Sequence, residues 1–200
     1  MLSTIVESIK IFKNQKNLIK DTMAKRALII TGNFVQDHEF IYPYYRLKEE
    51  GFEVTTALKN KESCVGSLGT NIPSDKDAKI IDYWEMDIRD FDLLILPGGV
   101  KCLEKLRQEQ GVLDFICRWD LEKKVIASIC HGTQLLISAK VIKGKKISGY
   151  YSIKDDINNA GATYVDAPFV TDGNIVSCPH YKYLGDWMKE VLRVFNEKND

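Results

Sequence analysis

The amino-acid sequence predicts an α/β fold in which helices cover a mostly parallel central sheet. Apolar, strand-like runs alternate with segments of helical spacing along most of the chain, and this alternation is typical of such folds. The run at 91–99, FDLLILPGG, is almost continuously apolar, which predicts a strand that is buried on both faces. At 200 residues the chain has the size of one domain.

The expected elements of the first half follow one another in a regular order. A strand is expected at 26–32, and a helix over 38–50 follows it, with Gly51 placed to end that helix. The second strand is expected at 52–58. We expect the mixed, polar stretch 60–90 to lie outside the central sheet.

The second half continues the alternation. Helical spacing covers 102–119, where Gly111 is expected to divide the helix. The run 124–129 predicts another buried strand with a helix directly behind it, and the tail over 184–195 predicts an amphipathic helix. Shorter strands are expected in KKISGY, GATYVD and GNIVSC. In open sheets of this kind, ligands bind beyond the carboxyl ends of the strands.

The first 22 residues are expected to form an N-terminal extension, disordered or helical, ahead of a single domain over 23–200. The stretch MAKRALIITG reads as an ordinary start followed by a first strand, and a short amphipathic helix over the preceding residues is the alternative. A secretory signal needs an uninterrupted apolar run, and here this run is broken by three charged residues, Glu7, Lys10 and Lys13.

Composition excludes several classes of function. Lysine plus arginine equals aspartate plus glutamate at 28 each, which leaves no electrostatic footprint for nucleic acid or an anionic membrane. No apolar run approaches the roughly 20 residues that span a bilayer. Because the cysteines are odd in number and form no C-x-x-C pair, we expect no disulfide framework, no metal and a cytoplasmic protein. The five are Cys64, Cys102, Cys117, Cys130 and Cys178.

The segment KKVIASICHG, at 123–132, is the strongest chemical signal. A cysteine at the junction of a buried strand and a helix must turn sharply, and Gly132 would let that helix start close to the strand, as in a nucleophile elbow. The helix N-terminus would favour a thiolate and lower the pKa of Cys130. A helix end stabilises a thiolate by only about 0.3–1 kcal/mol, which is too little to lower the thiol pKa far. A second polar group is therefore expected beside the sulfur, with Glu39 and His131 as candidates. A buried structural cysteine is the alternative.

Several motifs together resemble the ThiJ/PfpI superfamily, specifically its PfpI-like branch. They lie in order between residues 26 and 196, which is nearly the whole chain outside the extension. The motifs are DHEFIYPYYRLKEEGFEV, DLLILPGG, ASICHGTQLLISAKVIKGKKI, YYSIKDDINNAGATYVD, DGNIVS and WMKEVLRVF.

The resemblance implies a flavodoxin-like sandwich with helices on both faces, a homodimer or higher homo-oligomer, and no cofactor. Carried over by position, Cys130 would be the nucleophile and Glu39 a largely protonated acid that donates to its thiolate; otherwise Glu39 would be a solvated first-turn residue. His131 would be a general base, or a residue that merely caps the turn. The amides of Gly99 and His131 would form an oxyanion hole, with Gly98 beside them.

Two segments depart from the family pattern. Peptidase-like members continue Gly-Gly with Arg-x-Pro-Glu, but here GGVKCLE places Leu103 at the acid position and Glu104 one residue later, about 100° around a helix. Peptidase activity is therefore disfavoured, with Glu104 kept as a pocket residue.

The second departure is SCPHYKY, which replaces the Ser-Arg-x-Pro-x-Asp loop of the family. It offers His180 and Tyr181 as pocket residues, whereas packing of Tyr181 and Tyr183 under the last helix is the preferred alternative. Cys178 is expected to be a packing residue rather than a resolving thiol.

Three functions follow from these residues and the resemblance. The first is a cysteine enzyme, a hydrolase or a glyoxalase/deglycase-like protein, that attacks a small carbonyl or acyl substrate. The second is a redox-responsive stress or chaperone-like protein with an oxidisable Cys130. The third is an intracellular peptidase. A glutamine amidotransferase shares the general fold but needs a His-x-Glu pair after the cysteine, and His180 is followed by Tyr181 and Lys182.

Overall fold

The computed structural model describes residues 24–199, and the expectation for residues 1–22 lies outside them. Seven strands form the central sheet in the order β10-β11-β7-β6-β1-β2-β5, and every neighbouring pair is parallel except β10 and β11. Their bounds are β1 (Lys25–Ile30), β2 (Phe52–Ala57), β5 (Lys79–Ile81), β6 (Leu93–Leu96), β7 (Val125–Ile129), β10 (Val170–Asp172) and β11 (Ile175–Cys178).

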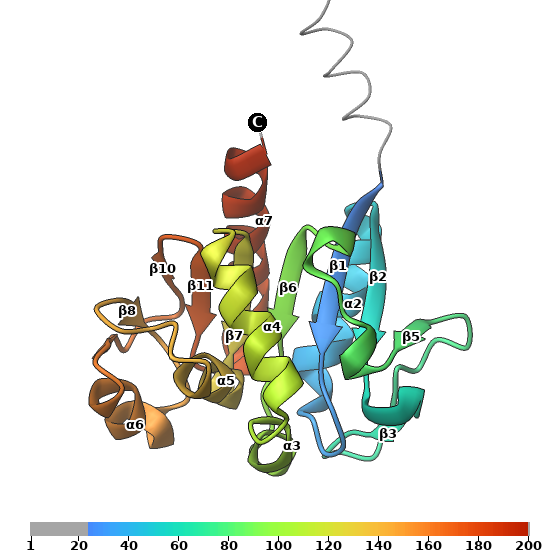
Figure 1. Cartoon of the computed structure of the whole chain (residues 1–200), viewed down its shortest axis with the longest axis horizontal. Coiled ribbons are helices and arrows are strands. Elements are labelled where there is room, and N and C mark those ends of the chain that lie inside the picture. The colour runs from blue at the N-terminus through green and yellow to red at the C-terminus, as the bar shows by residue number, and fades with distance from the viewer. Residues whose placement is uncertain (1–23, 200) are drawn as a thin grey trace, which may run out of the picture.

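Helices cover both faces of this sheet, as Figure 1 shows. The helices α2 and α7 contact each other and pack on one face, while α4 and α5 contact each other on the opposite face. The observed architecture is therefore the flavodoxin-like sandwich that the sequence predicts. The helix bounds are α2 (Asp37–Glu49), α3 (Val100–Leu106), α4 (Gln110–Leu121), α5 (Thr133–Ser138), α6 (Lys154–Asn159) and α7 (Leu184–Asn199).

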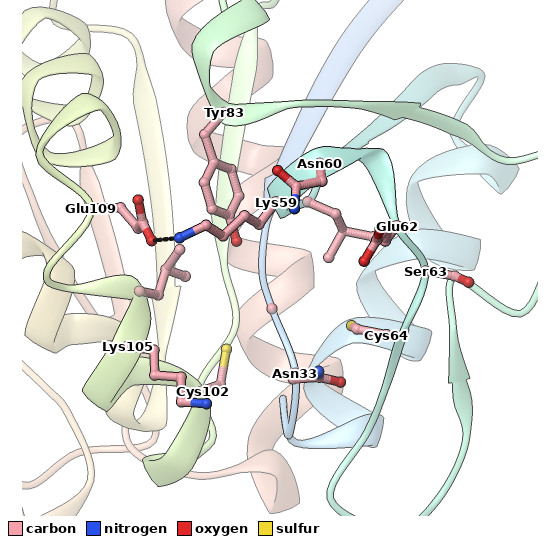
Figure 2. Close-up of a pocket in the computed structure, with 13 residues that line it drawn as sticks. Asn33, Lys59, Asn60, Glu62, Ser63, Cys64, Tyr83, Cys102, Lys105 and Glu109 are labelled. Carbon is pink, nitrogen blue, oxygen red and sulfur yellow. Dashed lines mark hydrogen bonds and ion pairs between the residues drawn. The ribbon is translucent and has the colours of Figure 1, made fainter.

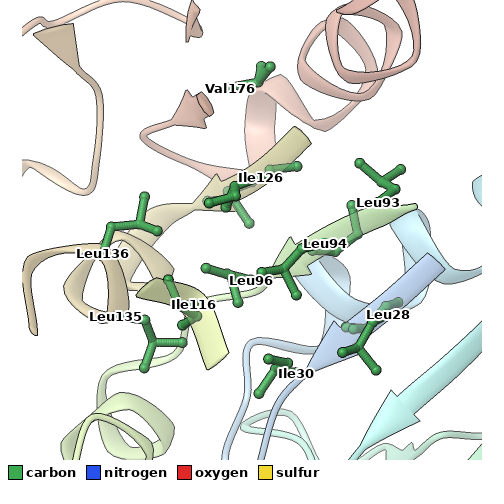
Figure 3. Close-up of a cluster of buried hydrophobic side chains, with 14 of the residues drawn as sticks. Leu28, Ile30, Leu93, Leu94, Leu96, Ile116, Ile126, Leu135, Leu136 and Val176 are labelled. Carbon is green, nitrogen blue, oxygen red and sulfur yellow. The ribbon is translucent and has the colours of Figure 1, made fainter. Parts of the chain in front are cut away.

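The core of the sandwich forms because the central strands are apolar on both faces. Figure 3 shows apolar side chains on both faces of four parallel strands, with those of α4 and α5 packed against one face, and each labelled residue is fully buried. The labelled residues are Leu28, Ile30, Leu93, Leu94, Leu96, Ile116, Ile126, Leu135, Leu136 and Val176.

Three parts of the structure differ from the elements expected. The stretch 60–90 does not lie wholly outside the sheet, because β5 pairs with β2 as an edge strand; the short pair β3 (Cys64–Val65) and β4 (Asn71–Ile72) does lie outside it. The helix break falls at 107–109 rather than at Gly111, which lies inside α4. A separate two-stranded sheet forms from β8 (Lys146–Ile147) and β9 (Thr163–Tyr164).

The strand order brings three loops together at one edge of the sheet. Because β1, β6 and β7 are neighbouring parallel strands, the segments that follow their carboxyl ends meet there. These segments carry Glu39 on α2, Gly98 after β6 and Cys130 after β7. The sheet topology thus assembles residues that are about 30 to 90 positions apart in the chain.

Candidate active site

Cys130 lies at a sharp turn between β7 and α5. It opens the 3-10 turn η4 (Cys130–Gly132), and its φ of 58° falls in the left-handed region, which is sparsely populated for residues other than glycine. Such a conformation costs about 1–3 kcal/mol and persists only where the surroundings impose it. This is the strand-to-helix elbow that the sequence predicts.

Gly132 permits that elbow because it brings the start of α5 against β6. A Cβ at this position would lie 2.1 Å from the carbonyl oxygen of Leu96 and 3.0 Å from the carbonyl oxygen of Pro97. Since these atoms belong to backbone, no side-chain rotation could relieve the contact. The glycine two residues after the cysteine is therefore required by packing.

Gly98 lies where three parts of the site converge. A Cβ there would be 2.6 Å from Glu39 Oε2, 2.8 Å from the backbone nitrogen of His131 and 2.9 Å from Cys130 Cβ. The next residue, Gly99, has a φ of 107°, and a Cβ on it would meet the backbone of 34–36. The two glycines thus let the loop after β6 lie directly against the cysteine and the glutamate.

Glu39 is fully buried in the first turn of α2, so the alternative of a solvated helix residue is wrong. Its Oε2 accepts a hydrogen bond of 2.9 Å from the Gly98 amide. The carboxyl also interacts with the Cys130 thiol, and within residues 24–199 Oε1 has no other hydrogen-bond partner. Burial raises the pKa of Glu39 to about 7, and the contacts with Gly98 and Cys130 oppose this rise. The carboxyl can therefore gain or lose a proton near neutral pH.

Two backbone amides and an imidazole ring lie around the Cys130 sulfur. The amides of His131 and Gly99 interact with it, and His131 Nδ1 lies 3.3 Å from Sγ. Burial nevertheless raises the pKa of the Cys130 thiol, a carboxylate at Glu39 raises it further, and the two amides lower it. The pKa lowering expected from the helix N-terminus is thus wrong for the thiol taken alone, because α5 has only six residues and the cysteine is only 7% exposed.

His131 is buried beside the sulfur and is held at both ring nitrogens. Its Nδ1 faces Cys130, and its Nε2 lies 3.3 Å from the hydroxyl of Ser152. The ring also contacts Tyr150 at a centroid distance of 4.8 Å. Burial lowers the pKa of His131, so the neutral imidazole predominates at pH 7 and can accept a proton. Sequence reasoning missed Ser152 and Tyr150, since neither lies near the cysteine in the chain.

His180 and Tyr181 lie near the site in space. Their rings are 4.1 Å apart, His180 faces Tyr150, and Tyr181 stacks on His38 at 5.3 Å. Tyr181 is 40% exposed, so the preferred alternative of packing under the last helix is wrong for it. That alternative holds for Tyr183, which packs against the core. Cys178 is fully buried at the end of β11, as expected for a packing residue.

The segment after Gly99 turns its acid away from the protein interior. On α3, Leu103 is fully buried, whereas Glu104 is exposed. Glu104 does not interact with the sulfur or with His131, so no acid of this segment completes a catalytic arrangement within residues 24–199. Its place in a pocket and the homo-oligomer that the resemblance implies stay predictions.

A cavity of about 330 Å³ opens elsewhere, between the loop after β2 and the helices α3 and α4 (Figure 2). Two buried thiols, Cys64 and Cys102, line it together with Tyr83. Lys59 and Glu109, which also line it, form an ion pair of 2.7 Å. Burial raises the pKa of Cys64 to about 11 and that of Cys102 to about 12. These thiols are therefore neutral, and none of the sequence-predicted site residues lines this cavity.

Residues 24–199 contain neither a cluster of metal-ligating side chains nor a helix that could span a membrane. No group of three or more histidine, cysteine, aspartate or glutamate side chains in this range is arranged to hold a metal ion. Within the same range, no helix combines the length and apolar character needed to cross a membrane.

The fold and the site define a class: flavodoxin-like α/β proteins with a cysteine on a strand-to-helix elbow and a buried glutamate beside it. Residues 25–194 match the model of the DJ-1/PfpI family, and the chain belongs to that family. It is 39% identical to Deglycase PfpI of Pyrococcus furiosus over 169 residues, which cover 84% of this chain and 98% of the relative.

Two further comparisons agree. The chain is 36% identical to General stress protein 18 of Bacillus subtilis over 148 residues, 74% of this chain and 84% of the relative. Among solved structures, a two-domain Anabaena variabilis protein with DJ-1/ThiJ/PfpI-like and ferritin-like domains matches with a TM-score of 0.78 and 31% identity. That match covers 84% of this chain and 47% of the Anabaena chain.

Proposed function

We propose that this protein is a cofactor-independent cysteine enzyme that converts small α-oxo aldehydes, such as methylglyoxal, into the corresponding hydroxy acids. The observation that carries the proposal is the grouping of the Cys130 thiol, the protonatable Glu39 carboxyl and two backbone amides around Gly98. Similarity to a relative named as a deglycase supports carbonyl chemistry of this kind.

The charge state of the pair follows from its donors. Cys130 and Glu39 interact directly, so the first proton lost belongs to the pair rather than to either residue. The sulfur faces the amides of His131 and Gly99 as well as His131 Nδ1, whereas the carboxyl has one amide donor, from Gly98. The single negative charge is therefore more stable on sulfur, with Glu39 protonated and donating to it.

The reaction then needs a thiolate, the acid Glu39, the base His131 and water. Sγ bonds to the aldehyde carbon, and the Glu39 proton passes to the aldehyde oxygen to give a hemithioacetal. Glu39, now a carboxylate, takes the proton from that carbon and returns it at the neighbouring carbon, while the hydroxyl proton passes to the neighbouring oxygen, which leaves a thioester of the hydroxy acid. Water, deprotonated by His131, releases the hydroxy acid and restores the thiol. Electrons balance within the substrate, because one carbon is oxidised and its neighbour reduced.

The test is the conversion of methylglyoxal to lactate by the purified protein. We expect turnover by the wild type and a loss on the order of 10³-fold or more in Cys130→Ala. Cys117→Ala is the matched control, because Cys117 is exposed on α4, and it should keep full activity. Lactate formation that survives Cys130→Ala would contradict the proposal.

The redox-responsive alternative receives less support. The similarity to a relative named General stress protein 18 is compatible with it. However, Cys130 is only 7% exposed, which favours a nucleophile inside an active site over a thiol that is freely accessible to oxidants. Mild peroxide followed by mass spectrometry distinguishes the two. Oxidation of Cys130 that outpaces methylglyoxal turnover would favour the sensor.

A further inference from the structure

The aromatic residues at the mouth of the site form one continuous row. The chain has three histidines, and all three belong to it. In order, the rings are His38, Tyr181, His180, Tyr150 and His131, with successive centroid distances of 5.3, 4.1, 6.0 and 4.8 Å. We call these five residues the aromatic row. It draws its rings from four separate segments, so the fold rather than local sequence brings them together.

The aromatic row runs from solvent to the nucleophile. His38 and Tyr181 are exposed at its outer end, whereas His131 at its inner end is buried with Nδ1 3.3 Å from Cys130 Sγ. Tyr151 is 72% exposed, and its ring lies beside that of Tyr150 at a centroid distance of 4.4 Å. A molecule that approaches the sulfur along this side meets aromatic faces and edges before it meets the thiol.

Hydrogen bonds hold two rings of the aromatic row in place. His180 Nδ1 accepts a hydrogen bond of 3.1 Å from the Lys182 amide, and His131 Nε2 lies 3.3 Å from the Ser152 hydroxyl. Rings that are fixed before a ligand arrives lose little side-chain entropy on binding. The aromatic row is therefore suited to stacking against a flat group.

The charges near the aromatic row indicate which flat group fits. The row itself contains no carboxylate. Burial lowers the pKa of His180, and the nearby Lys182 ammonium lowers it further, so this ring is neutral at pH 7. A substrate with a cationic substituent would meet Lys182 without a compensating anion in the row. A neutral, conjugated substituent would gain stacking contacts without that cost.

We propose that the aromatic row is a specificity site that favours carbonyl substrates with an aryl or similarly flat, conjugated group next to the reacting carbon. This inference rests on the proposed function, of which it defines the substrate class. The reacting carbonyl would lie at Cys130, and the flat group would stack along Tyr181 and His180.

The first experiment compares kcat/KM for phenylglyoxal and methylglyoxal, which share the reacting group and differ in the phenyl ring. Tyr181→Ala should lower the ratio of the two values by about two- to tenfold, the range that one aromatic contact supplies. His38→Ala should lower it less, because His38 stacks on Tyr181 and positions it. The control is Trp84→Ala, an exposed aromatic residue outside the row, which should leave the ratio unchanged.

A second experiment separates this inference from the proposed function, since it needs no turnover. Iodoacetamide and 2-iodo-N-phenylacetamide both alkylate a thiolate with loss of iodide, and only the second carries a phenyl ring. The measured quantity is the alkylation rate of Cys130 with the phenyl reagent divided by its rate with iodoacetamide. This ratio should be about two- to tenfold higher in the wild type than in Tyr181→Ala. The ratio of the two alkylation rates at Cys130 is divided by the same ratio measured with free glutathione. This division removes the difference in intrinsic reactivity between the two reagents.

The outcomes are distinct. Methylglyoxal turnover with unchanged ratios in Tyr181→Ala would overturn the aromatic row as a specificity site and leave the proposed function intact. Absent turnover with a ratio that still falls in Tyr181→Ala would reject the proposed function and support the row. Preference for a guanidinium-bearing iodoacetamide over the phenyl reagent, or failure of both reagents to reach Cys130, would also overturn it.

Discussion

Two buried thiols of this protein, Cys130 and Cys102, lie in separate regions and differ in what surrounds the sulfur. Cys130 has a left-handed backbone, a buried carboxyl, two amides and an imidazole around it. Cys102, in the cavity of Figure 2, lies on a regular helix, and its neighbours are a threonine hydroxyl, a glycine amide and another thiol. Burial raises the pKa of both thiols.

The comparison teaches that burial alone does not make a nucleophile. Among residues 24–199, the groups that interact with Cys102 cannot exchange a proton near pH 7: they are a hydroxyl, an amide and the thiol of Cys64, whose pKa is about 11. Cys130 has Glu39, whose pKa of about 7 lets the pair lose a proton under ordinary conditions. The carboxyl supplied by α2 is therefore the feature that separates the proposed nucleophile from the buried thiol of Cys102.

The largest expected effect comes from removing that carboxyl. Glu39→Leu should lower kcat/KM for methylglyoxal by about 10²–10⁴-fold, because both proton transfers lose their acid and base. Glu39→Gln keeps a donor toward the sulfur but cannot exchange a proton, so its thiolate should persist while kcat falls by a similar factor. Steady-state kinetics on the two variants measure this, and equal activity of Glu39→Leu and wild type would remove Glu39 from the mechanism.

Gly132→Ala sharpens the comparison at the level of the backbone. The new Cβ would collide with the carbonyl of Leu96 at 2.1 Å, so we expect a loss of about 3 kcal/mol or more in the free energy of unfolding. Gly185→Ala is the matched control, because a Cβ there meets open space in α7 and should be neutral or stabilising by up to about 1 kcal/mol. Urea unfolding of both variants provides the numbers, and similar stabilities would contradict the tight elbow.

The buried carboxyl also predicts how stability depends on pH. The folded pKa of Glu39, about 7, lies above its ordinary value of 4.5, so its contribution is fully present below pH 4.5 and is lost as pH rises through about 7. The difference corresponds to at most about 3 kcal/mol. Glu39→Gln should therefore gain stability relative to the wild type between pH 5 and pH 8. Parallel curves for the two proteins over this range would argue against a raised pKa.

The smallest effect is expected in the other region. Cys102→Ala removes one buried sulfur beside a cavity, which should cost about 1–2 kcal/mol of stability and leave kcat/KM within about twofold of wild type. Thermal unfolding and the methylglyoxal assay together check it. A large loss of activity with normal stability would make the second thiol region part of the catalytic machinery.

The sequence predicted the parts of the fold that depend on local pattern. The buried strands around β6 and β7 were recognisable from apolar runs, and the elbow from Cys130 and Gly132, because strand periodicity and glycine placement are local properties. The edge strand β5 was missed, since residues 79–81 are only partly buried and their pairing with β2 is a tertiary property. The strand β10 was also missed, although the Asp172-Gly173 turn before β11 is a hairpin signal.

The candidate site was predictable only in part for the same reason. The resemblance identified Glu39 beside Cys130, but the aromatic row joins residues from opposite ends of the chain, and no local pattern links His38 to Tyr181. For the thiol taken alone, the helix N-terminus predicted a lowered pKa, whereas burial raises it. Burial of the sulfur, which outweighs a helix of six residues, depends on the complete packing around it.

The most direct test is the pH dependence of iodoacetamide labelling at Cys130, followed by mass spectrometry in wild type, Glu39→Gln and Glu39→Leu. The account predicts an apparent pKa no higher than about 7 for the wild type, and one above the ordinary thiol value of about 8.5 for Glu39→Leu, with Glu39→Gln between them. A wild-type profile like that of a free thiol, or an unchanged profile in Glu39→Leu, would contradict the claim that the carboxyl of Glu39 stabilises the thiolate of Cys130.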